Sequence, residues 1–192
     1  SRHWLTAPHH KEESTETMNP TIAIFYGSST GNTEMAAEKI KEELGDFVSH
    51  VADVSKCEPE EMNQYDILLL GVSTWNIGEM QDDWDAFIPR MEGLDLVGKK
   101  VGFFAMGDAG GYPYNFLDAM GQLWEVVKGL GNPELVGVWP TEGYEFDESQ
   151  AMYDDDHFLG LGLDEENQSD LHDERIHAWL MKVMTDCKLL PA

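Results

Sequence analysis

Six consecutive residues near the start of the chain combine four hydroxyl side chains, a glycine and an asparagine, groups that can bind a ligand by hydrogen bonds. They are Ser28, Ser29, Thr30, Gly31, Asn32 and Thr33. The stretch before them, 21–26, is β-branched and aromatic, which favours a strand, and 32–44 has apolar residues at helical spacing. A helix N-terminus has unpaired N–H groups and a partial positive charge. A hydroxyl-rich turn at that position therefore predicts a phosphate site.

The turn lacks any basic side chain, because no Lys or Arg lies between Thr21 and Met35. The P-loop pattern needs glycines five apart and a Lys-Ser/Thr pair, whereas Gly27 and Gly31 are four apart and Asn32 replaces the lysine. The dinucleotide pattern G-x-G-x-x-G is also absent. Neutral donors suit one terminal monophosphate better than a triphosphate with its metal. An ordinary turn with Ser and Thr caps is the alternative interpretation.

Two later stretches follow apolar runs that read as buried strands, 67–72 and 101–106. The first stretch consists of Ser73, Thr74, Trp75, Asn76, Ile77 and Gly78, and the second begins Gly107, Asp108 and continues to Tyr112 and Asn115. In a doubly wound sheet these stretches and the hydroxyl turn lie at the carboxyl edge, where ligands bind. Two aromatic rings on different loops, Trp75 and Tyr112, can enclose a flat conjugated ring system.

These three stretches, in this order, resemble the FMN-binding loops of the flavodoxins, and the resemblance covers residue 21 to the C-terminus. It implies that 28–33 holds the FMN phosphate and that Trp75 and Tyr112 cover the two faces of the flavin ring. A backbone carbonyl in 76–78 would accept a hydrogen bond from the flavin nitrogen that takes up a proton. Groups around Asp108 and Asn115 would bind the pyrimidine edge.

Alternating βα units predict an α/β fold with helices on both faces of a parallel sheet, a flavodoxin-like three-layer sandwich. We expect five strands in the order 2-1-3-4-5. The strands are predicted at 21–26, 47–54, 67–72 and 101–106, with a fifth strand, 135–139 and 158–163, interrupted by the long loop 140–157. Such a loop resembles the long-chain flavodoxins. Helices are predicted at 32–44, 82–91, 115–130 and 170–187, with a helical turn at 57–64. Residues 1–20 read as a flexible extension, and 21–192 as one FMN-binding domain.

The chain has a formal net charge of −25, from 37 acidic and 12 basic residues. Such a charge excludes binding to nucleic acid and to anionic membranes, and it favours a partner with a basic face. Acidity that serves only solubility is the alternative. No apolar run approaches the ~20 residues of a membrane span, so no membrane insertion is expected.

Two cysteines, Cys57 and Cys187, form no disulfide framework, which indicates a reducing compartment. We therefore expect a cytoplasmic protein, or one of the plastid stroma if residues 1–20 are the remnant of a targeting segment. A monomer is expected.

The predicted function is an FMN-containing, low-potential, one-electron carrier, not an enzyme. A carboxylate about 10 Å from the flavin raises the energy of an added electron by roughly 0.4 kcal/mol, or about 18 mV. The expected partners are basic-faced redox proteins, such as a ferredoxin-NADP reductase or a photosystem-type donor. The alternative is an NAD(P)H:quinone-type reductase of the same fold, but no basic residue near the motifs could hold its nucleotide. A phospho-acceptor domain would need clustered carboxylates where the chain has Phe25-Tyr26-Gly27.

Several other features carry weaker signals. The run 154–156 is three aspartates without calcium-loop spacing, and His172 and His177 do not share a helix face, so no metal site is predicted. Trp124 and Trp179 are expected to pack in the core or on helix surfaces. The loop 141–157 has two open interpretations, a partner-recognition element and a neutral insertion.

Overall fold

The computed structural model describes residues 19–190. The expectation of a flexible extension over 1–20 therefore lies, for residues 1–18, outside the described part of the chain. In the described part, none of the helices combines the length and the apolar character needed to cross a membrane.

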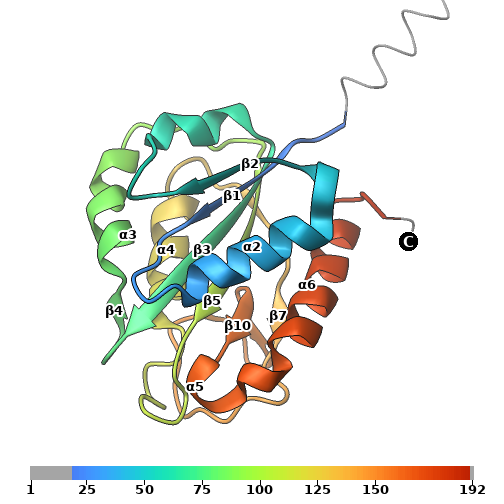
Figure 1. The fold of residues 1–192 in the computed structure, drawn as a ribbon. Helices are drawn as coiled ribbons and strands as arrows, with labels where there is room; N and C mark the ends of the chain where they lie inside the picture. The colour runs from blue at the N-terminus through green and yellow to red at the C-terminus, as the bar shows by residue number, and fades with distance from the viewer. Residues whose placement is uncertain (1–18, 191–192) are drawn as a thin grey trace, which may run out of the picture.

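The central sheet is parallel and has five strand positions (Figure 1). Its strands are β1 (Ile22–Tyr26), β2 (Val48–Asp53), β3 (Ile67–Trp75), β5 (Lys100–Met106), β6 (Glu134–Leu135) and β10 (Leu161–Leu163). They are arranged as β2-β1-β3-β5, and both β6 and β10 pair in parallel with β5. The predicted order 2-1-3-4-5 is thus confirmed, with β6 and β10 sharing the fifth position. Strand β3 is central and buried from Ile67 to Ser73, as its continuous apolar sequence requires.

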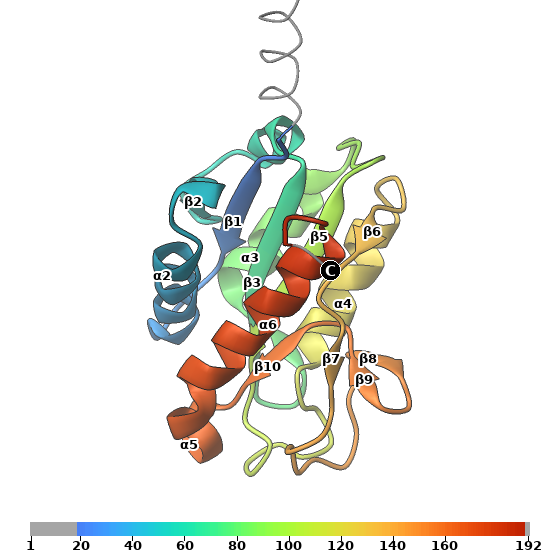
Figure 2. The same cartoon turned by 90° about the vertical axis from the view of Figure 1, so that its right-hand side faces the viewer.

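Helices cover both faces of the sheet, which gives the predicted three layers (Figure 2). One face packs against α2 (Asn32–Leu44) and α6 (His172–Asp186), and the other against α3 (Asp82–Phe87) and α4 (Asp118–Lys128). The core between the sheet and helices α2 and α6 includes Trp179, which is fully buried and donates its indole N–H to the carbonyl of Gly137 at 2.9 Å. Trp124 is partly buried against the core on the other face of the sheet. Both tryptophans therefore pack as predicted.

Three predicted helices differ in their bounds. The helix predicted at 82–91 turns into a 3-10 segment, Ile88–Met91, because Pro89 has no N–H to continue the α-helical ladder. The helix predicted from Asn115 begins three residues later, since Leu117 has a left-handed backbone (φ 61°) and the N–H of Ala119 donates to the hydroxyl of Thr74. The last predicted helix divides into α5 (Glu165–Gln168), a 3-10 turn (Ser169–Leu171) and α6.

The strand predictions at 135–139 and 158–163 were each too long. Gly137 has φ 73° and turns the chain away from β6, so β7 (Trp139–Pro140) lies in a different sheet. Between 140 and 157 the chain is also not a simple loop. Strands β7, β8 (Met152–Asp154) and β9 (His157–Phe158) form a small antiparallel sheet in the order β7-β9-β8.

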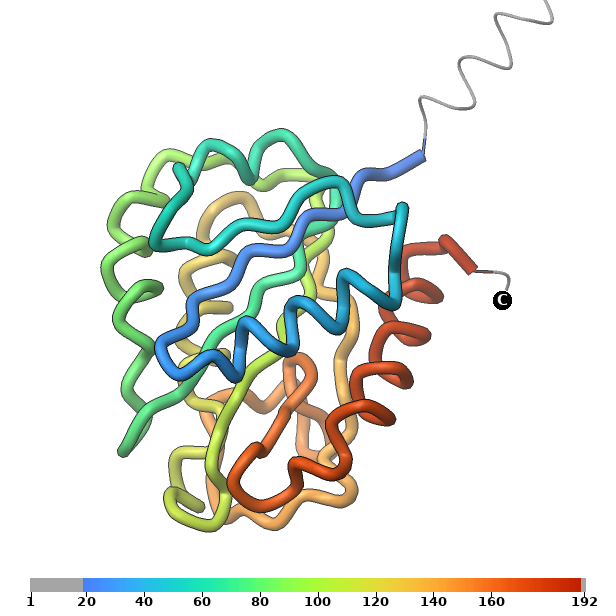
Figure 3. The backbone as a smooth tube through the Cα atoms, in the orientation of Figure 1, coloured from blue at the N-terminus to red at the C-terminus, as the bar shows by residue number. Residues whose placement is uncertain are grey.

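The remaining elements are short. A 3-10 helix, Pro59–Gln64, forms within the predicted turn at 57–64, and β4 (Glu79–Met80) pairs antiparallel with the end of β3. The described chain begins and ends at the same edge of the sheet (Figure 3), where Asn19 and Leu189 line one hollow. The opposite edge, at the carboxyl ends of the strands, carries the predicted site.

Candidate functional site

A cavity of about 330 Å³ lies at the carboxyl edge of the sheet. Nine of the predicted site residues line it. They are Thr30, Asn32, Ser73, Thr74, Trp75, Asn76, Gly107, Asp108 and Tyr112. The turn before α2, the end of β3, the loop after β5 and helix α5 all gather at this edge (Figure 1). The switch in strand order between β1 and β3 therefore brings together segments that are far apart in the sequence.

The hydroxyl turn leads directly into α2. Gly31 caps the helix with φ 91°, a left-handed backbone that glycine adopts without strain. No side chain of the described protein caps this end of α2, so its first N–H groups are available to an anion. Ser28 stabilises the turn by accepting the N–H of Gly31 at 3.1 Å.

The other hydroxyls of the turn divide into two kinds. Ser29 accepts a hydrogen bond from the side chain of Gln81 at 3.0 Å. Like Ser28, it therefore keeps its hydroxyl proton for a further acceptor. Thr33, by contrast, is buried, and its hydroxyl lies 2.6 Å from that of Ser73. Thr33 joins the start of α2 to the end of β3, and Thr30 lines the cavity itself.

The segment after β3 has an unusual backbone. Asn76 has φ 46° and Gly78 has φ 91°. A side chain at Gly78 would also place Cβ 2.8 Å from a carboxylate oxygen of Asp118, so only glycine fits there. The Gly78 carbonyl accepts the amide of Gln122 at 2.8 Å. Ile77, between them, is 72% exposed and does not line the cavity.

The two predicted aromatic residues both line the cavity. Trp75 ends β3 and is half-buried, and Tyr112 is 37% exposed on the loop after β5. The Tyr112 hydroxyl donates to the side-chain oxygen of Asn76 at 3.3 Å, which links the two loops. The aromatic pair is thus brought to one cavity from two different strands.

The loop after β5 is braced by the chain that follows β10. Asp108 accepts the N–H of Gly111 at 2.8 Å and the amide of Asn167 at 2.9 Å. The buried Asp164 accepts the N–H of Ala109 at 3.1 Å. Asn115 does not line the cavity, and its amide donates to Asp118 at 3.2 Å.

Four residues of the site were not predicted. Met106, Glu165 and Glu166 line the cavity, and the fully buried Gln81 supports Ser29 from outside it. The sequence does contain a signal for the two glutamates, since they come just after the predicted strand 158–163, whose end lies at the same edge of the sheet. With Asp108 they give the cavity three carboxylates and no basic side chain.

The end of β1 lacks the clustered carboxylates that a phospho-acceptor site needs. Tyr26 lies there, and its hydroxyl donates to Glu34 at 3.0 Å. Burial, together with this hydrogen bond, raises the pKa of Tyr26 to about 12, so the phenol stays protonated at neutral pH.

The family model described as Flavodoxin matches residues 24–179 of this chain. The chain belongs to the flavodoxin family. Among flavodoxins, that of Synechocystis sp. is 46% identical over 163 residues, which cover 84% of this chain and 95% of the relative. The flavodoxin of Klebsiella pneumoniae is 44% identical over 168 residues, 88% of this chain and 95% of the relative. The crystal structure of a Fusobacterium nucleatum flavodoxin bound to flavin mononucleotide has a TM-score of 0.81 and 28% identity, and the alignment covers 87% of this chain and 98% of that one.

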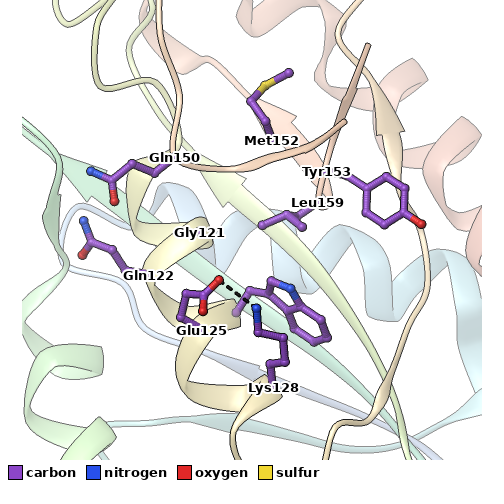
Figure 4. A pocket seen from close by; sticks show the side chains of 9 residues that line it. Gly121, Gln122, Glu125, Lys128, Gln150, Met152, Tyr153 and Leu159 are labelled. Atoms are coloured by element: carbon purple, nitrogen blue, oxygen red, sulfur yellow. Dashed lines mark hydrogen bonds and ion pairs between the residues drawn. The ribbon is translucent and has the colours of Figure 1, made fainter. Parts of the chain in front are cut away.

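This flavodoxin has a second, larger hollow of about 630 Å³ between α4 and the small antiparallel sheet (Figure 4). None of the predicted site residues line it. Gln122, Glu125 and Lys128 approach from α4, with an ion pair of 3.0 Å between Glu125 and Lys128. Met152 and Tyr153 approach from the segment 140–157, called the insertion below. In residues 19–190, His, Cys, Asp and Glu side chains nowhere form a group of three that could hold a metal.

Proposed function

We propose that this flavodoxin binds FMN in the cavity at the carboxyl edge of the sheet and carries single electrons between redox proteins. The decisive observation is the pairing of two features around one cavity. An uncapped helix N-terminus flanked by hydroxyls lies at one side, and Trp75 and Tyr112 line another. When bound, FMN supplies reversible one-electron chemistry.

The donor set of the turn fits a monophosphate. The N–H groups at the start of α2 and the hydroxyls of Ser28, Ser29 and Thr30 would hold it, with Asn32 beside them. Hydrogen bonds to a charged acceptor contribute about 1.5–3 kcal/mol each, so several neutral donors suffice without a lysine. The hydroxyl of Thr33 and the backbone of Gly31 would keep the turn in shape, while the backbone N–H of Thr33 is one of the helix N–H groups that would face the phosphate.

The backbone of 76–78 would supply a hydrogen-bond acceptor for the N–H that the flavin gains on electron uptake. Gln122 already donates to the carbonyl of Gly78, so the carbonyls of Asn76 and Ile77 are the candidates to accept this hydrogen bond. The left-handed conformations of Asn76 and Gly78 allow this peptide to turn at low cost. Trp75 and Tyr112 would cover the ring and exclude water, and the backbone near Gly107 and Asp108 would bind its polar edge.

The carboxylates of Asp108, Glu165 and Glu166 would keep the potential low, because each disfavours the arrival of negative charge. With no basic side chain in the cavity wall, nothing offsets this effect.

The partners we propose are redox proteins with a basic face, such as a ferredoxin-NADP reductase or a photosystem-type donor. The net charge of −25 supports this choice, because opposite charges steer transient association. We propose a monomer in a reducing compartment, the cytoplasm or the plastid stroma. The free thiols of Cys57 and Cys187 agree with such a compartment.

A potentiometric titration tests the function. An electron carrier should be reduced in two separated one-electron steps and should not oxidise NADPH at an appreciable rate by itself. A single two-electron step, or rapid NADPH oxidation by the purified protein, would instead support a reductase of the same fold.

A further inference from the structure

Gln81 is a buried polar residue that lies just outside the cavity, between β4 and α3. It is 0% exposed, which makes it the least exposed of the buried polar and charged side chains in residues 19–190. Burying an amide is costly unless its donors and its acceptor are paired. The partners of the Gln81 side chain therefore indicate its role.

Two groups of α3 fix the direction in which the Gln81 amide points. Its oxygen accepts the backbone N–H of Trp84 at 3.2 Å, and a backbone N–H can only donate. Its nitrogen donates to a carboxylate oxygen of Asp83 at 2.8 Å, and a carboxylate can only accept. A reversed amide would place two acceptors against each other at one end and two donors at the other. The same nitrogen must therefore be the donor to the hydroxyl of Ser29, at 3.0 Å.

This contact ties a surface turn to the central strand of the sheet. The backbone N–H of Gln81 donates to the carbonyl of Ser73, near the end of β3, at 3.1 Å. The chain leaving β1 passes close to Gln81, because a Cβ on Gly27 would lie 2.3 Å from its amide oxygen. Ser29, two residues further on, is exposed and belongs to the hydroxyl turn before α2. Its hydrogen bond from Gln81 thus reaches from the protein interior to the proposed phosphate site.

We propose that Gln81 is a positioning residue that acts through Ser29 to hold the turn 28–33 in the geometry that binds the FMN phosphate. A serine hydroxyl that accepts from Gln81 keeps its own proton for another acceptor. A turn that is already held in place also loses less freedom when a ligand binds. The inference rests on the proposed function, because it concerns the phosphate end of bound FMN. Gln81 should therefore affect the affinity for FMN and not that for riboflavin, which lacks the phosphate.

Three variants separate this role from general support of the fold. Gln81→Met keeps the length of the side chain but removes the donor to Ser29. Ser29→Ala removes the acceptor at an exposed position, where a loss of folding is not expected. Gln122→Met is the matched control, because the Gln122 amide donates at 2.8 Å to the carbonyl of Gly78, in the loop after β3 and not in the phosphate turn.

The first measurement is the NMR spectrum of the side-chain amides in the FMN-free protein. We expect Ser29→Ala to shift the amide signals of Gln81 and to speed the exchange of its amide protons with water. The signals of Gln122 should stay in place. Unchanged signals and exchange for Gln81 would overturn the contact. This result does not depend on FMN.

The second measurement is calorimetric titration of the wild type and the variants with FMN and with riboflavin. We expect Gln81→Met to weaken FMN binding by about threefold to tenfold, as for the loss of one hydrogen bond, and to leave riboflavin binding unchanged. Added to Ser29→Ala, it should weaken FMN binding no further, because both substitutions remove the same contact. Gln122→Met should change the two affinities by the same factor.

The outcomes that overturn the inference differ from those that overturn the proposed function. Equal weakening of both flavins in Gln81→Met, or additive losses in the double variant, would show that Gln81 only supports the fold. If Gln81→Met does not fold, Ser29→Ala decides, and an unchanged preference for FMN over riboflavin in that variant overturns the inference alone. A wild-type protein that takes up no FMN overturns the proposed function and this role together.

Discussion

Gly78 shows how one residue can combine a backbone requirement with a steric one. Its φ of 91° is strained for any side chain, and its Cα faces the buried carboxylate of Asp118. Gly93 has nearly the same conformation, φ 92°, but nothing lies within 4 Å of the place where its Cβ would be. The two glycines therefore differ in their surroundings and not in their backbone.

We predict that Gly78→Ala lowers the free energy of unfolding by about 1–3 kcal/mol more than Gly93→Ala does. Both variants bear the left-handed strain of about 1 kcal/mol, so the difference isolates the contact with Asp118. Urea unfolding of the FMN-free protein measures both. Equal losses in the two variants would show that Asp118 moves aside at no cost.

Tyr144 anchors the insertion to the main sheet. Its hydroxyl donates to the carbonyl of Gly162 at 2.7 Å and accepts the indole N–H of Trp139 at 2.8 Å, and the guanidinium of Arg175 lies 4.0 Å from its ring centre. Burial raises the pKa of Tyr144 to about 12, although Arg175 and the bond from Trp139 act in the opposite direction.

A raised pKa in the folded state means that the folded protein holds this proton more tightly than the unfolded chain. Tyr144 thus contributes a constant stability below about pH 10, the ordinary value, and this contribution is lost as the pH rises from about 10 to 12. We predict that Tyr144→Phe is less stable at pH 8, by about 1–2 kcal/mol from the lost hydrogen bonds, and loses less stability between pH 10 and 11 than the wild type. Urea unfolding at the three pH values tests this, and identical alkaline losses would contradict it.

At the scale of elements, the insertion is held closely against α4. A Cβ on Gly121 of α4 would lie 2.1 Å from the backbone oxygen of Gln150. Gly129, at the C-terminal end of the same helix, has an ordinary φ of −70° and no neighbour closer than 3.4 Å. Position 121 therefore requires glycine because the backbone at Gln150 lies so close, whereas position 129 does not require it.

We predict that Gly121→Ala destabilises the protein by about 1–3 kcal/mol, because backbone atoms must move. Gly129→Ala should instead be neutral or stabilising by up to about 1 kcal/mol, the usual gain of alanine over glycine in a helix. Thermal or urea unfolding compares them. If Gly121→Ala were as stable as Gly129→Ala, the insertion would be free to separate from α4.

The sequence predicts best those elements whose form depends on residues close together in the chain. The strand–turn–helix from β1 to α2 follows from adjacent residues, and α2 has the predicted bounds. The division of the fifth strand was missed because it depends on contacts far along the chain. A Cβ on Gly160, for example, would lie 2.2 Å from the backbone oxygen of Phe103, so the chain between β9 and β10 passes too close to β5 there for any side chain.

The same distinction applies to the site. The residues at the ends of β1, β3 and β5 could be predicted, because topology alone brings them to one edge. Gln81 could not, since it supports Ser29 across 52 residues, and a buried glutamine has no sequence signature of its own. The expectation that Asn115 binds the pyrimidine edge came from the resemblance alone, and the hydrogen bond from its amide to the buried Asp118 could not be read from the sequence.

At the scale of the whole molecule, the charge of −25 should govern encounters with partners. We predict that electron transfer from the reduced protein to a small basic cytochrome slows by about tenfold or more as ionic strength rises from about 0.01 to 0.15 M. Transfer to a neutral quinone should hardly change. Stopped-flow absorbance measures both rates, and a salt-independent rate with the cytochrome would argue that acidity serves only solubility.

The central claim is that a turn without a basic side chain holds the phosphate of a flavin mononucleotide. Calorimetric titration of the FMN-free protein with FMN and with riboflavin, which lacks the phosphate, tests it most directly. We predict one FMN per chain and riboflavin binding weaker by about a hundredfold or more, since two charged hydrogen bonds are worth at least about 3 kcal/mol. Equal affinity for the two flavins, or no uptake of FMN at all, would contradict the claim.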